Sequence, residues 1–158
     1  MTPDLTELYR EVVIDHSRRP RHFHPMDDAD AQAQGVNPFC GDRVTIYIKR
    51  TGDVLSDISF QGTGCAICTA SASLMTQTAR GRTLEDAQRL FDWFHHLLTS
   101  DKPVVQVPDE QAEQLSALSG VRQFPIRVKC ATLAWHALKA AMNQDAATVS
   151  TETIEPAK

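Results

Sequence analysis

A cysteine and an aspartate separated by one glycine, Cys40-Gly41-Asp42, form the short motif with the clearest chemical potential in this chain. Glycine lets the backbone bend tightly, so both side chains are able to turn toward one point. A thiolate and a carboxylate that converge repel each other unless a cation lies between them. Cys65 and Cys130 are distant along the sequence and are available to complete a tetrahedral set. We therefore expect one Zn²⁺ bound by Cys40, Asp42, Cys65 and Cys130.

The fourth cysteine, Cys68, makes a Cys-x-x-Cys pair with Cys65, a spacing found in zinc and redox sites. On a helix, two residues three apart lie on the same face. We favour burial of Cys68 as a small apolar side chain. The alternative is that Cys68 is itself a metal ligand.

The composition excludes several classes of protein. The chain has 158 residues, of which 42% are hydrophobic and 23% charged, and its formal net charge is −4. These values predict one folded domain with an ordinary core, and they give no reason to expect a nucleic-acid partner. No apolar run has the length of a membrane span, and the N-terminus lacks the features of a signal peptide. We therefore expect a cytoplasmic protein with reduced thiols.

Hydrophobic periodicity predicts an α+β fold in which a small antiparallel sheet of three strands packs with about five helices. We expect strands at 34–39, 44–49 and 54–61, and helices at 4–17, 66–80, 84–98, 109–118 and 130–142. An extended loop is expected at 120–129, so that Cys130 opens the last helix. We expect a single domain over residues 1–142, followed by a disordered polar tail over 143–158.

The remaining titratable groups are open to two interpretations. The basic segment from Asp15 to His24 is either a solvated loop, or a docking surface for an acidic partner or a helper around the metal. We expect the histidines on later helices, His95, His96 and His136, to be ordinary surface or boundary residues. Because Cys65 precedes a predicted helix, the helix dipole should favour its thiolate.

Four separated motifs resemble the SufU family, a branch of the IscU-like and NifU N-terminal-like iron–sulfur assembly proteins. They are Leu8-Tyr9 with Ile14-Asp15-His16 and Pro20-Arg21; Asn37-Pro38-x-Cys40-Gly41-Asp42; Gly62-x-Gly64-Cys65-Ala66-Ile67 with Ala70-Ser71; and Arg122-x-Phe124-Pro125-x-Arg127-x-Lys129-Cys130-Ala131. The resemblance implies an IscU-like fold. One motif departs from the family pattern, since Ser17 and His22 replace its usual residues, which weakens any contact inferred for that segment.

Two features resemble the SufU branch more than the scaffold branch. Scaffold-type relatives have a histidine directly before the third cysteine, where this chain has Lys129, and they have a shorter connection between the second and third cysteines. The resemblance therefore implies a zinc-dependent sulfurtransferase. Such an enzyme accepts persulfide sulfur from a pyridoxal-phosphate-dependent cysteine desulfurase of the SufS type and serves a downstream iron–sulfur scaffold complex.

The mechanism that the resemblance implies is ligand exchange. The desulfurase supplies a histidine to zinc, and Cys40 is released as the thiolate that attacks the persulfide. Arg127 would stabilise the thiolate or persulfide of Cys40, and Lys129 would act similarly, although either cation could simply be solvated. A closed site of one aspartate and three cysteines is otherwise typical of structural zinc, as in a passive interaction module.

A scaffold that assembles transient 2Fe–2S clusters is the main alternative function. A zinc deaminase is excluded, because the chain has no His-x-Glu motif.

Overall fold

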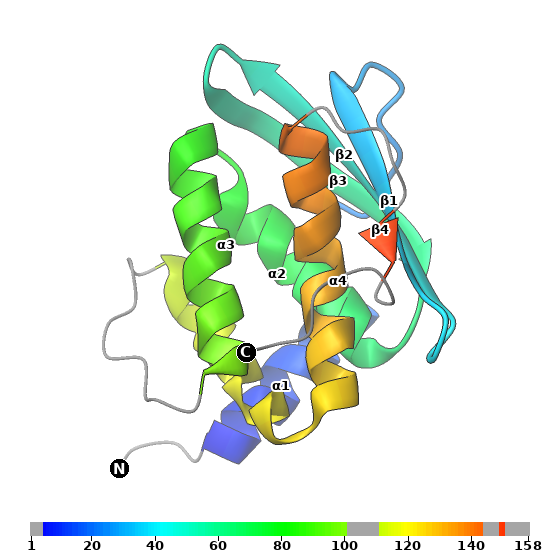
Figure 1. The fold of residues 1–158 in the computed structure, drawn as a ribbon, viewed down its shortest axis with the longest axis vertical. Helices are drawn as coiled ribbons and strands as arrows, with labels where there is room; N and C mark the ends of the chain where they lie inside the picture. Colours follow the sequence, from blue (N-terminus) through cyan, green and yellow to red (C-terminus); the bar gives the residue numbers. More distant parts are fainter. Residues whose placement is uncertain (1–4, 101–110, 144–148, 151–158) are drawn as a thin grey trace.

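The computed structural model describes residues 5–100, 111–143 and 149–150, and in it a sheet lies on one side and helices cover the other (Figure 1). The strands β1 (Ala31–Asn37), β2 (Asp42–Thr51) and β3 (Val54–Thr63) pair antiparallel with β2 in the centre. Buried residues alternate along β2, as a period of two requires. The predicted three-stranded antiparallel sheet is therefore confirmed.

Five helical segments, as predicted, pack with this sheet. They are α1 (Leu5–Arg18), α2 (Ala66–Ala79), α3 (Leu84–Thr99), the 3-10 helix η1 (Gln111–Gln123) and α4 (Pro125–Met142). Helix α4 contacts β1 and β2 on one side and α2 and α3 on the other, which makes it the central helix of the fold (Figure 1). No helix in the described part of the chain is long and apolar enough to cross a membrane.

The contact between α2, α3 and α4 is fixed by two aromatic rings and a serine. Trp135 of α4 stacks on Phe94 of α3 with ring centroids 4.7 Å apart, and both side chains are fully buried. The Trp135 indole N–H donates to Ser71 Oγ at 3.1 Å, and the Ser71 hydroxyl donates to the Ala131 carbonyl. Burial of such aromatic side chains contributes about 2–3 kcal/mol each. These contacts hold α2 and α4 beside each other.

The predictions for the segment before Cys130 are wrong. Residues 120–129 do not form an extended loop, because η1 continues to Gln123 and α4 begins at Pro125. Cys130 consequently lies in the second turn of α4 and does not open it. The physical reason is that a proline at the first helical position has the right φ already and lacks an N–H that would have no helical partner. Pro125 therefore starts the helix.

The C-terminal region adds an element that was not expected. Val149 and Ser150 form a short strand, β4, that pairs parallel with Gly35 and Val36 at the free edge of β1. The first strand is also shifted, since it spans Ala31–Asn37 where 34–39 was predicted. The rest of the predicted tail, residues 144–148 and 151–158, lies outside the described residues, and the domain boundary at residue 142 stays a prediction.

Candidate metal centre

The loop from Asn37 to Asp42 joins β1 to β2 and carries the first two candidate ligands. The Asn37 side-chain oxygen accepts a hydrogen bond from the Phe39 N–H at 3.2 Å, and the Asn37 carbonyl accepts one from the Gly41 N–H at 2.9 Å. Gly41 has a φ of +72°, a left-handed conformation that glycine adopts without cost. This turn leaves Cys40 exposed at its tip and places Asp42, 2% exposed, in the interior. Asp42 is therefore not a surface turn residue.

Close backbone approach joins Asp42 to the start of α2. The Cys65 N–H donates to Asp42 Oδ1 at 2.8 Å, and Cys65 Sγ lies 3.9 Å from Asp42 Oδ2. A Cβ on Gly64 would lie 2.7 Å from Asp42 Oδ1, so this contact requires glycine. The Gly-x-Gly-Cys motif thus serves to bring the carboxylate against the second cysteine.

Cys65 is the N-cap of α2, as the sequence predicted from its position before a helix. Its sulfur accepts a hydrogen bond from the Cys68 N–H at 3.4 Å. Cys68 itself is buried, as predicted, and burial raises the pKa of its thiol. The Cys-x-x-Cys pair therefore has one sulfur at the site and one in the core.

Cys130 reaches the same place from the second turn of α4. It is fully buried, and its Sγ lies 3.5 Å from Cys40 Sγ. The Asn37 side-chain amide donates to Cys130 Sγ and to Asp42 Oδ2, each at 3.4 Å. Sequence reasoning did not identify Asn37 as a site residue. The available signal was its place before Pro38 in a turn that leads to a cysteine, where asparagine commonly bonds the following backbone.

The ligand atoms of Cys40, Asp42 and Cys130 all lie within 4.8 Å of one another, the spacing that a single metal ion requires. Two sulfurs bound 2.3 Å from one tetrahedral zinc are about 3.8 Å apart, and the Cys40 and Cys130 sulfurs are separated by 3.5 Å. Cys65 lies outside this group of three, although its sulfur touches Asp42. The donor set of thiols and a carboxylate fits zinc.

The protons at the site are shared unevenly between two thiols. A hydrogen bond from Cys130 lowers the pKa of the Cys65 thiol to about 6, and the backbone N–H of Cys68 acts in the same direction. The interaction with Cys65 and burial raise the pKa of Cys130. The thiols therefore resist becoming anionic together in the absence of a cation. A divalent cation would remove that conflict.

A hollow of about 380 Å³ opens beside Cys40 at the start of α4. It is lined by Cys40, Gln123, Phe124, Pro125, Ile126 and Arg127. Arg127 is exposed and forms no ion pair within the described part of the chain. The first turn of a helix adds partial positive charge from its free N–H groups. Arg127 and the N-terminal end of α4 therefore both favour negative charge in the hollow that contains Cys40.

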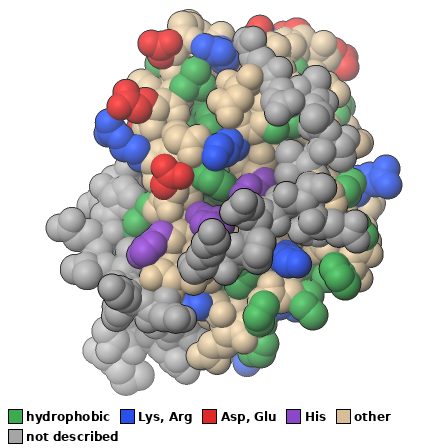
Figure 2. Space-filling model, in the orientation of Figure 1, with side chains coloured by type: hydrophobic (Ala, Val, Ile, Leu, Met, Phe, Trp, Pro, Cys, Tyr) green, Lys and Arg blue, Asp and Glu red, His purple; other side chains and the backbone are tan. Residues whose placement is uncertain are grey.

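Large apolar side chains surround this hollow. Phe39, Phe124 and Ile126 are 73%, 58% and 59% exposed, and the Lys129 ammonium lies 5.5 Å from the centroid of the Phe39 ring. Figure 2 shows hydrophobic side chains gathered at the lower right, the part of the molecule where α4 begins in Figure 1. An exposed apolar surface around a reactive side chain is typical of a protein contact surface.

The basic segment near α1 does not join the metal centre. His16 is buried, and its Nδ1 lies 2.8 Å from the Ser73 hydroxyl, about two turns along α2 from Cys65. Arg21 forms an ion pair with Asp15 at 2.8 Å. The segment is therefore partly fixed by its own contacts, and His16 is not a helper of the metal site.

His95 and His96 are on α3 and His136 is on α4. Figure 2 shows histidine side chains near the middle of the face that it displays. His96 is exposed, and His95 and His136 are half-buried with ring centroids 5.8 Å apart. Burial lowers the pKa of His136 to about 4, so this ring is neutral. Within the described residues these histidines form no metal-ligand group. Their burial agrees with the prediction of surface or boundary residues, since His96 is at the surface and His95 and His136 are at the boundary of the core.

The chain is similar to known proteins over most of its length. Residues 8–131 match the model of the NifU-like N terminal domain. The chain is 42% identical over 142 residues to the "Iron-sulfur cluster assembly scaffold protein IscU" of Streptococcus pyogenes serotype M1, covering 90% of this chain and 87% of that protein. It is 38% identical over 138 residues to the "Zinc-dependent sulfurtransferase SufU" of Bacillus subtilis (strain 168), covering 86% and 90%.

A solved structure is also similar to this chain. The putative iron–sulfur cluster assembly scaffold protein for the SUF system from Fervidobacterium islandicum AW-1 superposes with a TM-score of 0.77 at 28% identity, covering 86% of this chain and 97% of that one. The two chains therefore share the α+β fold described here. The chain therefore belongs to the NifU-like N-terminal domain family, the group that includes the proteins named IscU and SufU.

Proposed function

We propose that this protein is a cytoplasmic, zinc-dependent sulfurtransferase. It accepts persulfide sulfur on Cys40 from a pyridoxal-phosphate-dependent cysteine desulfurase of the SufS type and delivers it to a downstream iron–sulfur scaffold complex. The observation that carries the proposal is one exposed thiol, Cys40, in contact with a buried thiol and beside a buried carboxylate. The similarity to the Bacillus subtilis protein named as a zinc-dependent sulfurtransferase supports it.

Cys40, Asp42, Cys65 and Cys130 would hold the zinc. The ion would keep its sulfur ligands deprotonated at neutral pH, which supplies a nucleophile without redox chemistry. Asp42 is oriented by the Cys65 N–H, and Asn37 donates hydrogen bonds to Asp42 and Cys130. Such outer hydrogen bonds fix the direction of a ligand and tune its affinity.

The transfer step is a thiol exchange. The Cys40 thiolate attacks the outer sulfur of the desulfurase persulfide, a sulfur–sulfur bond forms on Cys40, and the original bond breaks to release the desulfurase cysteine as a thiolate. No net oxidation or reduction takes place, because one such bond replaces another. Arg127, which lines the same hollow as Cys40, would stabilise the negative charge of the persulfide.

The proposal is tested by measuring cysteine desulfurase turnover with this protein added in its zinc-loaded form. The wild-type chain should stimulate turnover and acquire persulfide, whereas Cys40→Ala should do neither. Cys68→Ala is the matched control, because it removes a buried cysteine that lies outside the ligand group, and it should retain one zinc per chain. If Cys40→Ala stimulated desulfurase turnover as much as the wild type, the sulfurtransferase proposal would be wrong and the protein would be a passive interaction module.

A scaffold for transient 2Fe–2S clusters is the second candidate, favoured by the name of the Streptococcus pyogenes relative. The same cysteines would hold that cluster. Metal content separates the two functions, since the sulfurtransferase should be purified colourless with zinc and the scaffold brown with iron and sulfide. Replacing Lys129 with histidine, the residue at that position in scaffold-type relatives, should shift the protein toward iron binding if position 129 decides between them.

A further inference from the structure

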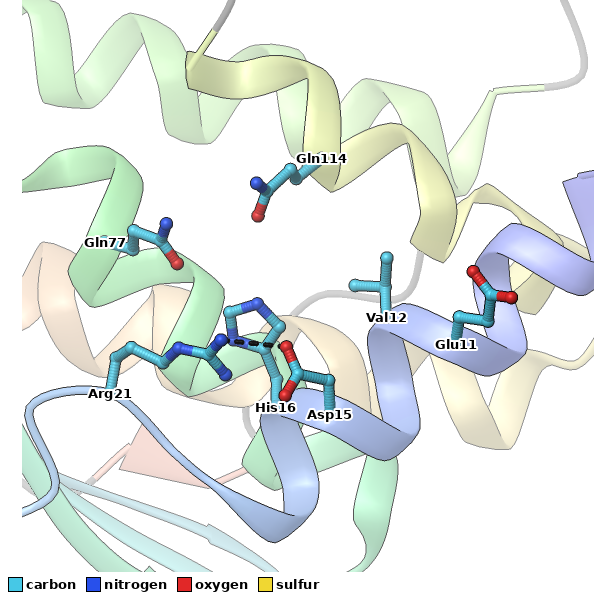
Figure 3. A pocket seen from close by; sticks show the side chains of 7 residues that line it. All are labelled: Glu11, Val12, Asp15, His16, Arg21, Gln77 and Gln114. Carbon is cyan, nitrogen blue, oxygen red and sulfur yellow. Dashed lines mark hydrogen bonds and ion pairs between the residues drawn. The ribbon is translucent and has the colours of Figure 1, made fainter. Parts of the chain in front are cut away.

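A second cavity, separate from the candidate metal centre, lies between α1, the segment that follows it, α2 and η1 (Figure 3). Its volume is about 400 Å³, and none of its lining residues is among the candidate zinc ligands. That volume falls within the range of small-molecule sites. Its polar groups come from four separate segments, so the fold itself brings them together.

His16 forms the inner wall of this cavity and is only 4% exposed. Ser73 Oγ accepts a hydrogen bond from the Arg21 backbone N–H, and His16 Nδ1 lies 2.8 Å from the same oxygen. We assign Nδ1 as the acceptor of the Ser73 hydroxyl proton, because that hydroxyl has no other acceptor among the described residues. Burial, followed by the charge of Arg21, lowers the pKa of His16, so the ring is neutral, and with Nδ1 assigned as an acceptor its one proton is on Nε2. Figure 3 shows this second nitrogen turned toward Gln114. It is a fixed hydrogen-bond donor.

Further donors surround His16. The Arg21 guanidinium bonds to Asp15 and to the Arg19 carbonyl, which leaves several of its five N–H groups unused. Gln77 of α2 and Gln114 of η1 extend their amide groups into the cavity from the other side (Figure 3). Neither amide has a hydrogen-bond partner among the residues that the structure describes. Such a group of donors suits a carboxylate.

The other end of the cavity has the opposite character. Glu11 lies beyond Val12 in Figure 3, and its carboxylate forms no ion pair with the described residues. Arg21 neutralises Asp15, and His16 is neutral, so the lining has a net charge of about −1. A ligand with one carboxylate and additional positive charge matches this distribution, whereas a phosphate-like dianion does not. Val12 offers an apolar surface between the two ends.

We propose that this cavity binds a free basic α-amino acid. Its carboxylate lies at the donors of His16, Gln77 and Gln114, its aliphatic side chain passes over Val12, and its terminal cation meets Glu11. The site is independent of sulfur transfer at Cys40, so its failure would leave the proposed function untouched. The contacts are few and partly exposed, which corresponds to a dissociation constant on the order of 1 mM for L-lysine.

The test is an NMR titration of the zinc-loaded full chain with L-lysine, observing the side-chain amides of Gln77 and Gln114 and the His16 ring. L-norleucine has the same aliphatic stem without the cation and should bind about fivefold more weakly. L-lysinamide lacks the carboxylate and should bind about tenfold more weakly. Saturable shifts confined to this cavity are the expected result.

Variants then test which residues contact the carboxylate of the ligand and which contact its terminal cation. Gln77→Ala and Gln114→Ala should each weaken L-lysine binding about fivefold, while Gln32→Ala, an exposed glutamine on β1, should have no effect. Glu11→Gln should abolish the preference for L-lysine over L-norleucine. The proposal is overturned if the cavity signals do not saturate, if L-norleucine binds as well as L-lysine, or if the glutamine variants bind like the wild type.

Discussion

The sulfur atoms of Cys40 and Cys130 lie 3.5 Å apart, yet the two thiols differ strongly in burial. Cys40 lies at the exposed tip of a turn between two strands, whereas Cys130 is fully buried in α4 and accepts a hydrogen bond from Asn37. A side chain with few contacts can leave its position at little cost, and a buried one cannot. The pair therefore combines an anchor with a thiol that is able to leave, which is what the sulfur transfer proposed for Cys40 requires.

The largest expected effect is a difference in unfolding free energy between variants at Cys130 and at Cys40. In the metal-free protein, Cys130→Ala should lower the free energy of unfolding by about 2–3 kcal/mol, because it leaves a cavity and removes an acceptor of the Asn37 amide. Cys40→Ala should change it by less than about 0.5 kcal/mol. Urea unfolding in the presence of a chelator measures both. Equal losses would mean that the exposed turn is as firmly packed as the helix.

A smaller effect is expected where the backbone of Gly64 approaches Asp42. Gly64→Ala places a methyl group 2.7 Å from Asp42 Oδ1 and should cost about 1–2 kcal/mol in unfolding free energy. Metal affinity should fall as well, since Asp42 must turn away from Cys65. The neighbouring Thr63→Ala, at an exposed position, is the control and should be nearly neutral. An unchanged metal affinity in Gly64→Ala would argue against Asp42 as a ligand.

The pH dependence of the metal-free protein tests the uneven sharing of protons. The pKa of Cys65 is about 6 in the folded chain and 9.0 ordinarily, so the unfolded chain binds more protons between those values. Stability should therefore increase from pH 6 to pH 9 and be lost as the pH falls through 6, by about 1 kcal/mol after screening at a partly exposed sulfur. The raised pKa of Cys130 opposes this only above its ordinary value. Unfolding curves of Cys65→Ser should lack the increase.

The smallest effect on stability, with a clear effect on transfer, is expected at Arg127. Because its side chain is exposed, Arg127→Ala should change unfolding by less than about 0.5 kcal/mol. Persulfide acquisition by Cys40 should fall about tenfold, because the anionic persulfide loses a neighbouring cation that stabilises its charge. Arg127→Lys should recover part of the rate, and Arg43→Ala, an exposed arginine on β2, should leave it unchanged. If Arg127→Ala acquired persulfide at the wild-type rate, Arg127 would be an ordinary solvated arginine with no role in transfer.

Regular elements with strong periodicity were predictable from the sequence, and irregular ones were not. The alternation of Val44, Ile46 and Ile48 located β2, and the apolar stripe of α3 located that helix. The start of α4 was missed because Phe124-Pro125 fits a loop as well as a helix N-terminus, and only tertiary packing decides between them. The pairing of β4 with β1 depends on two residues, too short for any pattern.

Three residues that the structure brings together at the candidate site, Cys40, Asp42 and Cys130, were among those expected from the sequence, but the side chain that supports them was not. The types and spacing of Cys40 and Asp42 indicated a metal, and the structure brings both to Cys130. The role of Asn37 depends on contacts with side chains 5 and 93 positions away, which sequence spacing does not reveal. The cavity at His16 was also invisible, because its polar groups come from segments with no shared motif.

The thiol at the N-cap of α2 has a practical consequence. Serine or threonine is common at that position, but here a free amide of the first helical turn, that of Cys68, donates to the sulfur of Cys65. The electron density on that sulfur changes whenever it is protonated, oxidised or bound by an ion. The NMR chemical shift of the Cys68 amide should therefore report the chemical state of the Cys65 sulfur in solution, without an added probe.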